Sequence, residues 1–101
     1  MRDYLTPSAR RTLTLLAEPD AELTHCRGQW WIENDRQSPA AGKLLLQLCL
    51  IHCDYSGGKK DNYEVYTINE EGRQILKDPA YRPKIIDAFQ EWIKRQEEER
   101  L

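Results

Sequence analysis

Every cysteine and histidine of the chain falls into one of two short clusters. The first is the pair His25-Cys26, and the second is the stretch CLIHC, which holds Cys49, His52 and Cys53. Thiolate and imidazole groups are the ligands that zinc prefers, and a structural site usually takes four of them from two segments. The two clusters therefore hold the atoms for a zinc site, provided that the fold brings them together.

The expected local structure argues against ligation. Neighbouring residues of a strand point to opposite faces, so His25 diverges from Cys26, and His52 diverges from Cys53, if both segments are strands. Cysteine also packs well as a small buried hydrophobe, which is the simpler role here. We therefore predict no metal and no cofactor, with a zinc site and a redox-sensing pair of cysteines as the alternatives.

Catalytic groupings are missing from the pattern as well. No Ser, His and Asp stand where one fold would bring them together, and no pair of carboxylates marks an obvious cleft. Gly57-Gly58-Lys59 lies between two expected strands, whereas a P-loop precedes a helix. We predict that the protein is not an enzyme.

Composition sets the broad class. The chain has 101 residues, 40% of them apolar, and its 15 Lys and Arg against 17 Asp and Glu give a net charge of −2. Such a chain forms one soluble domain, and DNA binding would need a locally basic face. The sequence has no apolar run of about 18 to 20 residues and no apolar core in its first residues, so we expect a cytoplasmic location without structural disulfides.

Two Ser/Thr-Pro pairs predict helix starts. Thr6-Pro7 and Ser38-Pro39 each place a capping hydroxyl before a proline at the first helical position. The first helix should run to about residue 17 and the second to about residue 48, each with one apolar stripe. A third, short helix should begin at Asn69 as its cap and end near Lys77.

Strands are expected between these helices. Residues 22–33 favour two short strands around a turn at Arg27-Gly28, and residues 34–37 read as a polar loop. Residues 50–55 and 63–68 favour a second hairpin, whose tip is the flexible stretch 56–62. Trp30 and Trp31 are neighbours in a strand, so one should face the core and the other the surface.

A last helix should start near Pro83 and carry a strong apolar stripe. Its members recur at helical spacing: Ile85, Ile86, Phe89, Trp92 and Ile93. Residues 94–100 are polar, so we expect this end to be solvated or frayed. The stripe either closes the core against the first helix or joins two copies of the chain, and we predict a homodimer.

The segment Tyr66-Thr67-Ile68-Asn69-Glu70-Glu71-Gly72-Arg73 resembles the end of the wing in winged-helix regulators of the PadR and MarR type. There the second wing strand often runs into a Tyr-x-Leu-Thr-x-x-Gly-Arg pattern. Here Ile68 stands for the Leu and Asn69 for the Thr, and Gly72 should let the short helix pack closely on its neighbour. The resemblance covers roughly residues 38–77.

The resemblance implies an α+β fold: a winged-helix-like domain over residues 1–78 with an extra N-terminal hairpin, and a C-terminal helix over 79–101 for dimerisation. The helix from Ser38 corresponds to the recognition helix. One departure is that residues 22–33 read as strands where the family has a second helix, so the approach to a major groove differs from that of a helix-turn-helix pair.

The resemblance implies a transcription regulator that binds double-stranded DNA. It implies no interaction with a membrane. A recognition helix would read bases, and a basic wing would hold phosphates. The candidate contacts are Ser38, Lys43, Gln47, Lys59, Lys60 and Asn62, with Arg10, Arg11 and Arg36 widening the footprint. The alternative is a non-catalytic protein–protein interaction module with the same fold, which the acidic net charge and the missing second helix favour.

Overall fold

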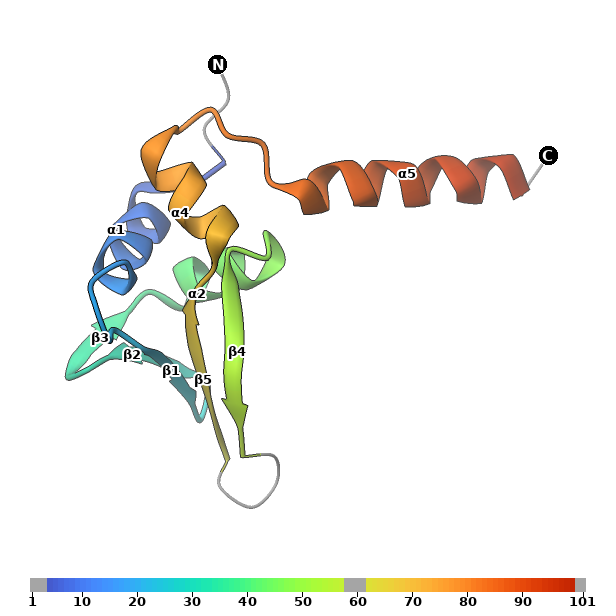
Figure 1. Cartoon of the computed structure of the whole chain (residues 1–101). Coiled ribbons are helices and arrows are strands. Elements are labelled where there is room, and N and C mark those ends of the chain that lie inside the picture. The colour runs from blue at the N-terminus through green and yellow to red at the C-terminus, as the bar shows by residue number, and fades with distance from the viewer. Residues whose placement is uncertain (1–3, 58–61, 100–101) are drawn as a thin grey trace.

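The computed structural model describes residues 4–57 and 62–99, which form an α+β fold of four helices and one five-stranded antiparallel sheet (Figure 1). The α+β class predicted from the sequence is confirmed. In chain order the elements are α1 (Pro7–Leu16), β1 (Leu23–Cys26), β2 (Gln29–Ile32), β3 (Asp35–Gln37), α2 (Pro39–Gln47), β4 (Ile51–Ser56), β5 (Tyr63–Ile68), α4 (Glu70–Lys77) and α5 (Lys84–Glu99). No helix in the described part of the chain is both long and apolar enough to cross a membrane.

Side-chain caps begin three of the helices, as predicted. The Thr6 hydroxyl accepts a hydrogen bond from the Ala9 amide at 3.2 Å, and the Ser38 hydroxyl accepts from the Ala41 amide at 3.4 Å. The Asn69 side chain accepts from the Gly72 amide at 2.9 Å. Each cap satisfies a backbone donor that the first helical turn leaves without a partner.

The sheet has the strand order β3-β2-β1-β5-β4. The turn between β1 and β2 lies at Arg27 and Gly28, whose φ angles of 52° and 78° are those that two-residue hairpins require. Both predicted strands of this region and both strands of the second hairpin are confirmed. Strand β1 pairs with β5, so the two hairpins form one continuous sheet.

The prediction of a polar loop over residues 34–37 is wrong, because Asp35–Gln37 is the edge strand β3. Trp30 pairs with Gln37, and Ile32 pairs with Asp35, after a two-residue turn in which Glu33 has a φ of 54°. No apolar alternation and no turn glycine marks this strand. Its pairing comes from the backbone of β2, which is a tertiary effect on a polar sequence.

Two glycines let elements approach closely. A methyl group on Gly42 of α2 would overlap the indole ring of Trp30, which is only 3% exposed. A methyl group on Gly72 of α4 would lie 2.5 Å from the Leu50 carbonyl oxygen. The predicted close packing at Gly72 is confirmed, and α2 lies directly on strand β2.

The core lies between α1, α2, α4 and one face of the sheet. Its most deeply buried side chains are Leu13, Leu16, Leu23, Leu45, Leu50 and Ile75, all exposed by 1% or less. Burying each contributes roughly 2 kcal/mol to stability. These residues come from four elements and from the junction between α2 and β4, so the core ties the region from α1 to α4 together.

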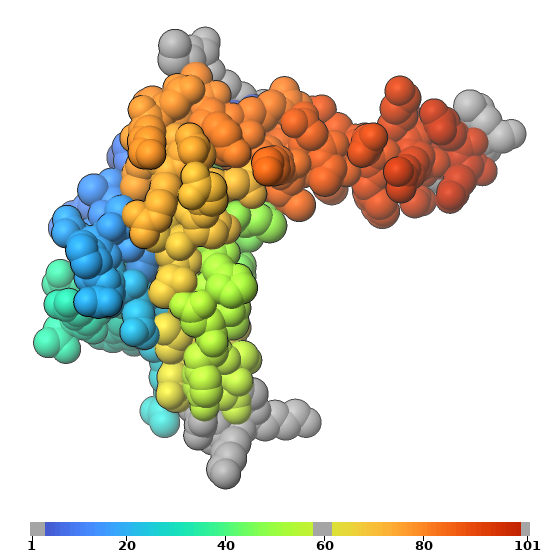
Figure 2. Space-filling view, in the orientation of Figure 1, coloured from blue at the N-terminus to red at the C-terminus, as the bar shows by residue number. Residues whose placement is uncertain are grey.

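Helix α5 departs from this body and extends to one side (Figures 1 and 2). None of its residues is buried, and only Ile85 and Ile86 at its beginning pack against the core. The alternative in which the apolar stripe closes the core against α1 is therefore wrong. The polar residues up to Glu99 continue as helix, and most of them are exposed, so this end is solvated without being frayed.

Candidate nucleic-acid interface

Helix α2 divides cleanly into a buried face and an exposed face. Ala41, Gly42 and Leu45 are buried against α1 and the sheet. Lys43 and Gln47, two of the predicted DNA contacts, are exposed on the opposite face. The helix is thus fixed by the core while one lysine and one amide point to solvent. The exposed face also carries Leu46, which is 42% exposed.

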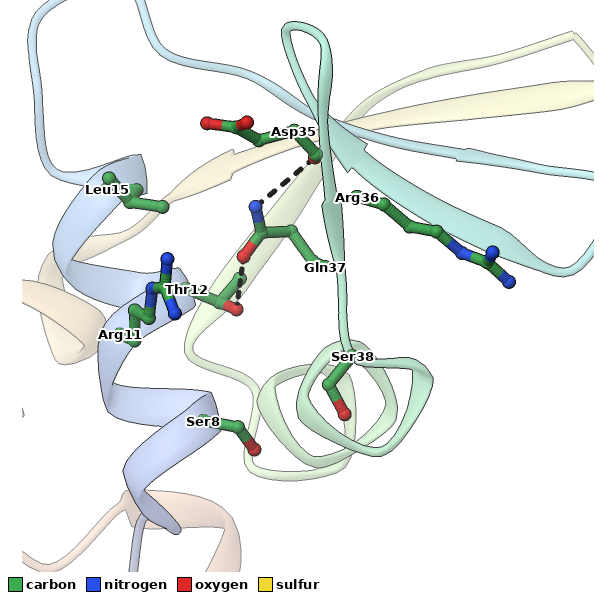
Figure 3. Close-up of a pocket in the computed structure, with 8 residues that line it drawn as sticks. All are labelled: Ser8, Arg11, Thr12, Leu15, Asp35, Arg36, Gln37 and Ser38. Atoms are coloured by element: carbon green, nitrogen blue, oxygen red, sulfur yellow. Dashed lines mark hydrogen bonds between the residues drawn. The ribbon is translucent and has the colours of Figure 1, made fainter.

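A cleft of about 200 Å³ opens where α1 meets the beginning of α2 (Figure 3). Its lining comes from α1, from β3 and from the α2 cap: Ser8, Arg11, Thr12, Leu15, Asp35, Arg36, Gln37 and Ser38. Figure 3 shows Arg11 beside Thr12, and Arg36 extending away from β3 in the other direction. Arg11 and Arg36 are both exposed, but only Arg11 points toward the beginning of α2, because Arg36 shares the face of its partner Trp31.

A buried hydrogen bond fixes the geometry of this cleft. The Thr12 hydroxyl donates to Gln37 Oε1 at 2.7 Å, and Gln37 Nε2 donates to the Asp35 carbonyl at 3.2 Å. Thr12 and Gln37 are only 1% and 8% exposed. The two side chains satisfy each other, so their role is to lock α1 to β3, immediately before α2 begins.

The segment from Arg36 to Cys53 contains no Asp and no Glu, although the chain holds 17 acidic residues. It includes α2 and carries Arg36 and Lys43. The N-terminal end of a helix adds a partial positive charge, which favours nearby anions. The protein as a whole is slightly acidic, but this segment is positive. Sequence reasoning used the net charge and passed over this local gap in acidic residues.

The hairpin of β4 and β5 reaches away from the helices (Figure 1). Near its tip, Asn62 is exposed and has a φ of 62°. The rings of Tyr55 and Tyr63 lie 5.2 Å apart and support the two strands against each other. Lys59 and Lys60, the predicted phosphate contacts, lie outside the described residues.

Polar side chains also tie the two hairpins together on the inner face of the sheet. His25 stacks on Trp30 at 4.2 Å, and its Nδ1 lies 3.3 Å from Glu64 Oε1. The Tyr66 hydroxyl donates to Glu64 Oε2 at 2.6 Å. This bond, followed by that of His25, lowers the pKa of Glu64, while burial raises the pKa of Tyr66. The network joins β1 to β5 and needs no ligand.

The two Cys/His clusters lie on strands that are not neighbours. Strand β5 separates His25 and Cys26 on β1 from His52 and Cys53 on β4. His52 lies 3.6 Å from Asp54. Within residues 4–57 and 62–99, no three Cys, His, Asp or Glu side chains gather as metal ligands would. Cys49 and Cys53 are exposed, so the prediction that the cysteines are buried packing residues is wrong for these two.

The opposite face of the sheet carries Trp31, as the pair of neighbouring tryptophans predicted. Trp30 is buried under α2, whereas Trp31 is only partly buried. Thr24 and Val65 share its face by register and are partly buried too. This face is thus the solvent side of the sheet.

The remaining residues that were predicted to contact DNA differ in exposure and in their neighbours. Ser38 is partly buried, and its hydroxyl is engaged as the α2 cap. Arg10 is partly buried and is not among the residues that line the cleft. Gln47 borders an apolar groove at the root of α5 as well as the exposed face of α2. The structure therefore places Arg11 beside the beginning of α2, whereas Arg36 pairs with Trp31 and lies on the face of the sheet away from α2.

Comparison of the chain with protein-family models, with curated proteins and with solved structures found no match. The resemblance to winged-helix regulators therefore stays a prediction.

Proposed function

We propose that the chain is a winged-helix-like, non-catalytic regulator that binds double-stranded DNA through the exposed face of α2. Lys43 and Gln47 would meet base edges or phosphates in the major groove. Arg11 would hold the backbone beside the start of α2. The β4–β5 hairpin would act as the wing and reach the flanking backbone with Asn62, Lys59 and Lys60.

The observation that carries this proposal is the acid-free segment from Arg36 to Cys53 around an exposed helix face. Phosphates of DNA attract such a surface even when the net charge of the protein is negative, because screening confines electrostatic interactions to about 8 Å at physiological salt. A B-form major groove is wide enough for one helix. Helix α2 has a solvent-facing side along its length, which supports its use as the reading element.

The structure also supports an explanation for the missing second helix. In a helix-turn-helix pair the first helix braces the second. Here α1 and the Trp30 ring brace α2, and the Thr12–Gln37 hydrogen bond locks the entry to it. The β1–β3 meander would thus replace the bracing helix.

A second candidate function is a protein-interaction module. It is favoured by one observation, the exposed apolar stripe of α5, where Phe89 and Trp92 are 58% and 56% exposed. Large aromatic side chains in solvent typically mark contact surfaces. This candidate needs no basic face on α2.

The test is binding of a fluorescent random-sequence duplex across a salt series. Arg11→Ala/Lys43→Ala should weaken binding about tenfold and lower the salt slope by about 2. The matched control Arg73→Ala/Lys77→Ala removes two exposed charges from α4 and should change binding by less than about threefold. Lys59→Ala/Lys60→Ala should weaken binding if the wing takes part.

An equal loss of binding in the Arg11/Lys43 variant and in the control would indicate non-specific attraction and would count against the α2 interface. If the duplex does not bind at low salt, the DNA-binding proposal is wrong and the protein-interaction module becomes the favoured function.

A further inference from the structure

The solvent side of the sheet carries aromatic and apolar side chains where polar ones are expected. Strand register places one row of side chains across all five strands of this face, in the order Arg36, Trp31, Thr24, Val65 and Tyr55. An antiparallel sheet with one free face usually turns polar residues to solvent. Here the row holds one charged residue, although 32% of the chain is charged.

The neighbouring row adds another aromatic ring. Tyr63 pairs with Cys26 and lies on the same side of the sheet as Trp31. The rings of Tyr63 and Tyr55 lie 5.2 Å apart at an angle of 35°, and the two residues are 36% and 41% exposed. The residues Trp31, Tyr55, Tyr63 and Arg36 are here called the outer platform.

The helices leave the outer platform uncovered. Leu23, Trp30 and Tyr66 lie on the other face of the sheet and belong to the core that α1, α2 and α4 close. Trp31 belongs neither to this core nor to the partly buried residues that pack against it, and the same holds for the two tyrosines of the platform. A ligand can therefore reach the platform from solvent.

The size of the platform fits a short stretch of a polymer with flat side groups. Neighbouring strands lie about 4.8 Å apart, so Trp31 and Tyr55, on strands three spacings apart, stand roughly 14 Å from each other. Thr24 and Val65 between them are small, which leaves room above the sheet. Sheets that bind RNA typically stack about two or three bases on such aromatic side chains.

Two arginines border the platform. Arg36 stands at the β3 end of the row, is exposed, and has no carboxylate partner among the described residues. Arg27 is exposed in the turn between β1 and β2, where it lines a hollow of about 220 Å³ together with Tyr63. Guanidinium groups bind phosphates well, so both borders suit an anionic backbone.

The nearby carboxylates are engaged or lie outside the row. The Asp54 carboxylate on β4 accepts a hydrogen bond from the Thr67 hydroxyl at 2.7 Å. Glu64 borders the hollow from the other face of the sheet, where its carboxylate accepts a hydrogen bond as well. Glu22 and Glu33 lie before β1 and after β2, beyond the row. The two arginines are thus the charged groups that a ligand on the platform meets first.

We infer that the outer platform binds a single-stranded nucleic acid. Its bases stack on Trp31 and on the pair of Tyr55 and Tyr63, while Arg36 and Arg27 bind phosphates. A nucleic acid matches both features of the surface, because its bases are flat and its backbone is anionic. A proline-rich peptide would use the rings alone. The site lies on the face of the sheet opposite α2, so the inference goes beyond duplex binding and does not depend on it.

The first test is binding of fluorescent single strands of about eight nucleotides, in DNA and in RNA form, measured by anisotropy at low salt. Trp31→Leu and Tyr63→Leu should each weaken binding at least about fivefold, because a stacking contact is lost. Arg36→Ala should lower the salt slope by about 0.7. The control Trp92→Leu removes an exposed ring from α5 and should change binding by less than about twofold.

Two further variants separate stacking from shape and this site from α2. Trp31→Phe keeps a ring and should retain most of the affinity that Trp31→Leu loses. Arg11→Ala/Lys43→Ala should leave single-strand binding within about twofold while it weakens duplex binding, so the two proposals stand or fall separately. Tighter binding of one form assigns the platform to DNA or to RNA, and equal affinity assigns it to both.

Three outcomes of these measurements overturn the inference. The first is that neither single strand binds at low salt. The second is that Trp31→Leu binds as tightly as the wild type. The third is that a proline-rich peptide binds in a Trp31-dependent way and the single strands do not, which would make the platform a peptide site.

Nuclear magnetic resonance locates the ligand without any substitution. The three tryptophans of the chain report on three places, because Trp30 is buried, Trp31 lies on the platform and Trp92 is exposed on α5. Addition of unlabelled oligothymidylate should shift the indole N–H signal of Trp31 most, because a stacked base places it in a ring current. A shift confined to Trp92, or equal shifts of all three signals, overturns the inference.

Discussion

Helices α2 and α5 each carry an apolar face, which α2 buries in the core and α5 leaves largely exposed. Helix α2 buries Ala41, Gly42 and Leu45 and exposes mainly polar or small residues. Helix α5 has no fully buried residue and exposes two aromatic rings. The core alone stabilises α2, so its outward face is free to bind a ligand. Helix α5 leaves most of its apolar face exposed in the single chain.

The largest expected difference between the two helices is in hydrogen exchange. Amides of α2 should be protected at least about a thousandfold, because they open only when the body unfolds. Amides of α5 beyond Phe89 should exchange quickly in dilute protein and become protected as the concentration rises. Hydrogen exchange with mass spectrometry at two protein concentrations measures both. Equal, concentration-independent protection of the two helices would break the comparison.

Truncation of one side chain in each helix should show the same contrast in stability. Leu45→Ala removes a fully buried side chain and should lower the free energy of unfolding by about 2 to 5 kcal/mol. Phe89→Ala should change it by less than about 1 kcal/mol in dilute protein, because its ring is already in water. Urea denaturation at low protein concentration gives both values. Leu46→Ala is the control within α2, with an expected change below about 1 kcal/mol.

Loss of the hydrogen bond between Thr12 of α1 and Gln37 of β3 should destabilise the body that holds α2 and leave α5 unaffected. Thr12→Val keeps the shape of the side chain but leaves Gln37 Oε1 buried without its donor, which should cost about 1 to 3 kcal/mol. Thr12→Ser retains the hydroxyl and should recover part of that loss. The second substitution Gln37→Leu on Thr12→Val should also recover stability. Thermal unfolding of the four proteins tests this, and a loss that Gln37→Leu deepens would contradict it.

The smallest expected effect is the pH dependence of the sheet beneath α2. Hydrogen bonds from Tyr66 and His25 hold the pKa of Glu64 below its ordinary value of 4.5. The unfolded chain therefore takes up a proton first. The contribution of Glu64 is fully present above pH 4.5 and is lost as the pH falls through the lower folded-state pKa. Denaturation of wild type and Glu64→Gln between neutral pH and pH 3 should show a smaller acid loss in the variant. Identical pH profiles would exclude this role.

Local signals predicted most of the secondary structure. Thr6, Ser38 and Asn69 begin helices because a side-chain oxygen caps the first turn wherever such residues precede a helical pattern. Arg27-Gly28 forms the first turn because glycine tolerates a positive φ. Strand β3 escaped prediction because its residues are polar and its pairing partner, not its own sequence, makes it a strand.

The candidate site was predictable only in part. Lys43 and Gln47 stand out because they are the two polar side chains of the α2 sequence PAAGKLLLQ and lie off its apolar stripe. The cleft between α1 and β3 was not predictable, because Thr12 and Gln37 are 25 positions apart in the chain and only their hydrogen bond in the folded protein joins α1 to β3. The separation of the Cys/His clusters likewise depends on β5 lying between β1 and β4.

The sequence by itself determined where the helices and four of the five strands lie, which faces are apolar, and that residues 84–99 carry an apolar stripe with two aromatic residues. These properties are local, since caps, turns and periodicity act within a few residues. Only the tertiary structure decided that α2 is buried on one side, that β3 completes the sheet and that α5 leaves the body. Those outcomes depend on which distant surfaces fit together, and close packing at Gly42, Gly72 and Leu45 selects them.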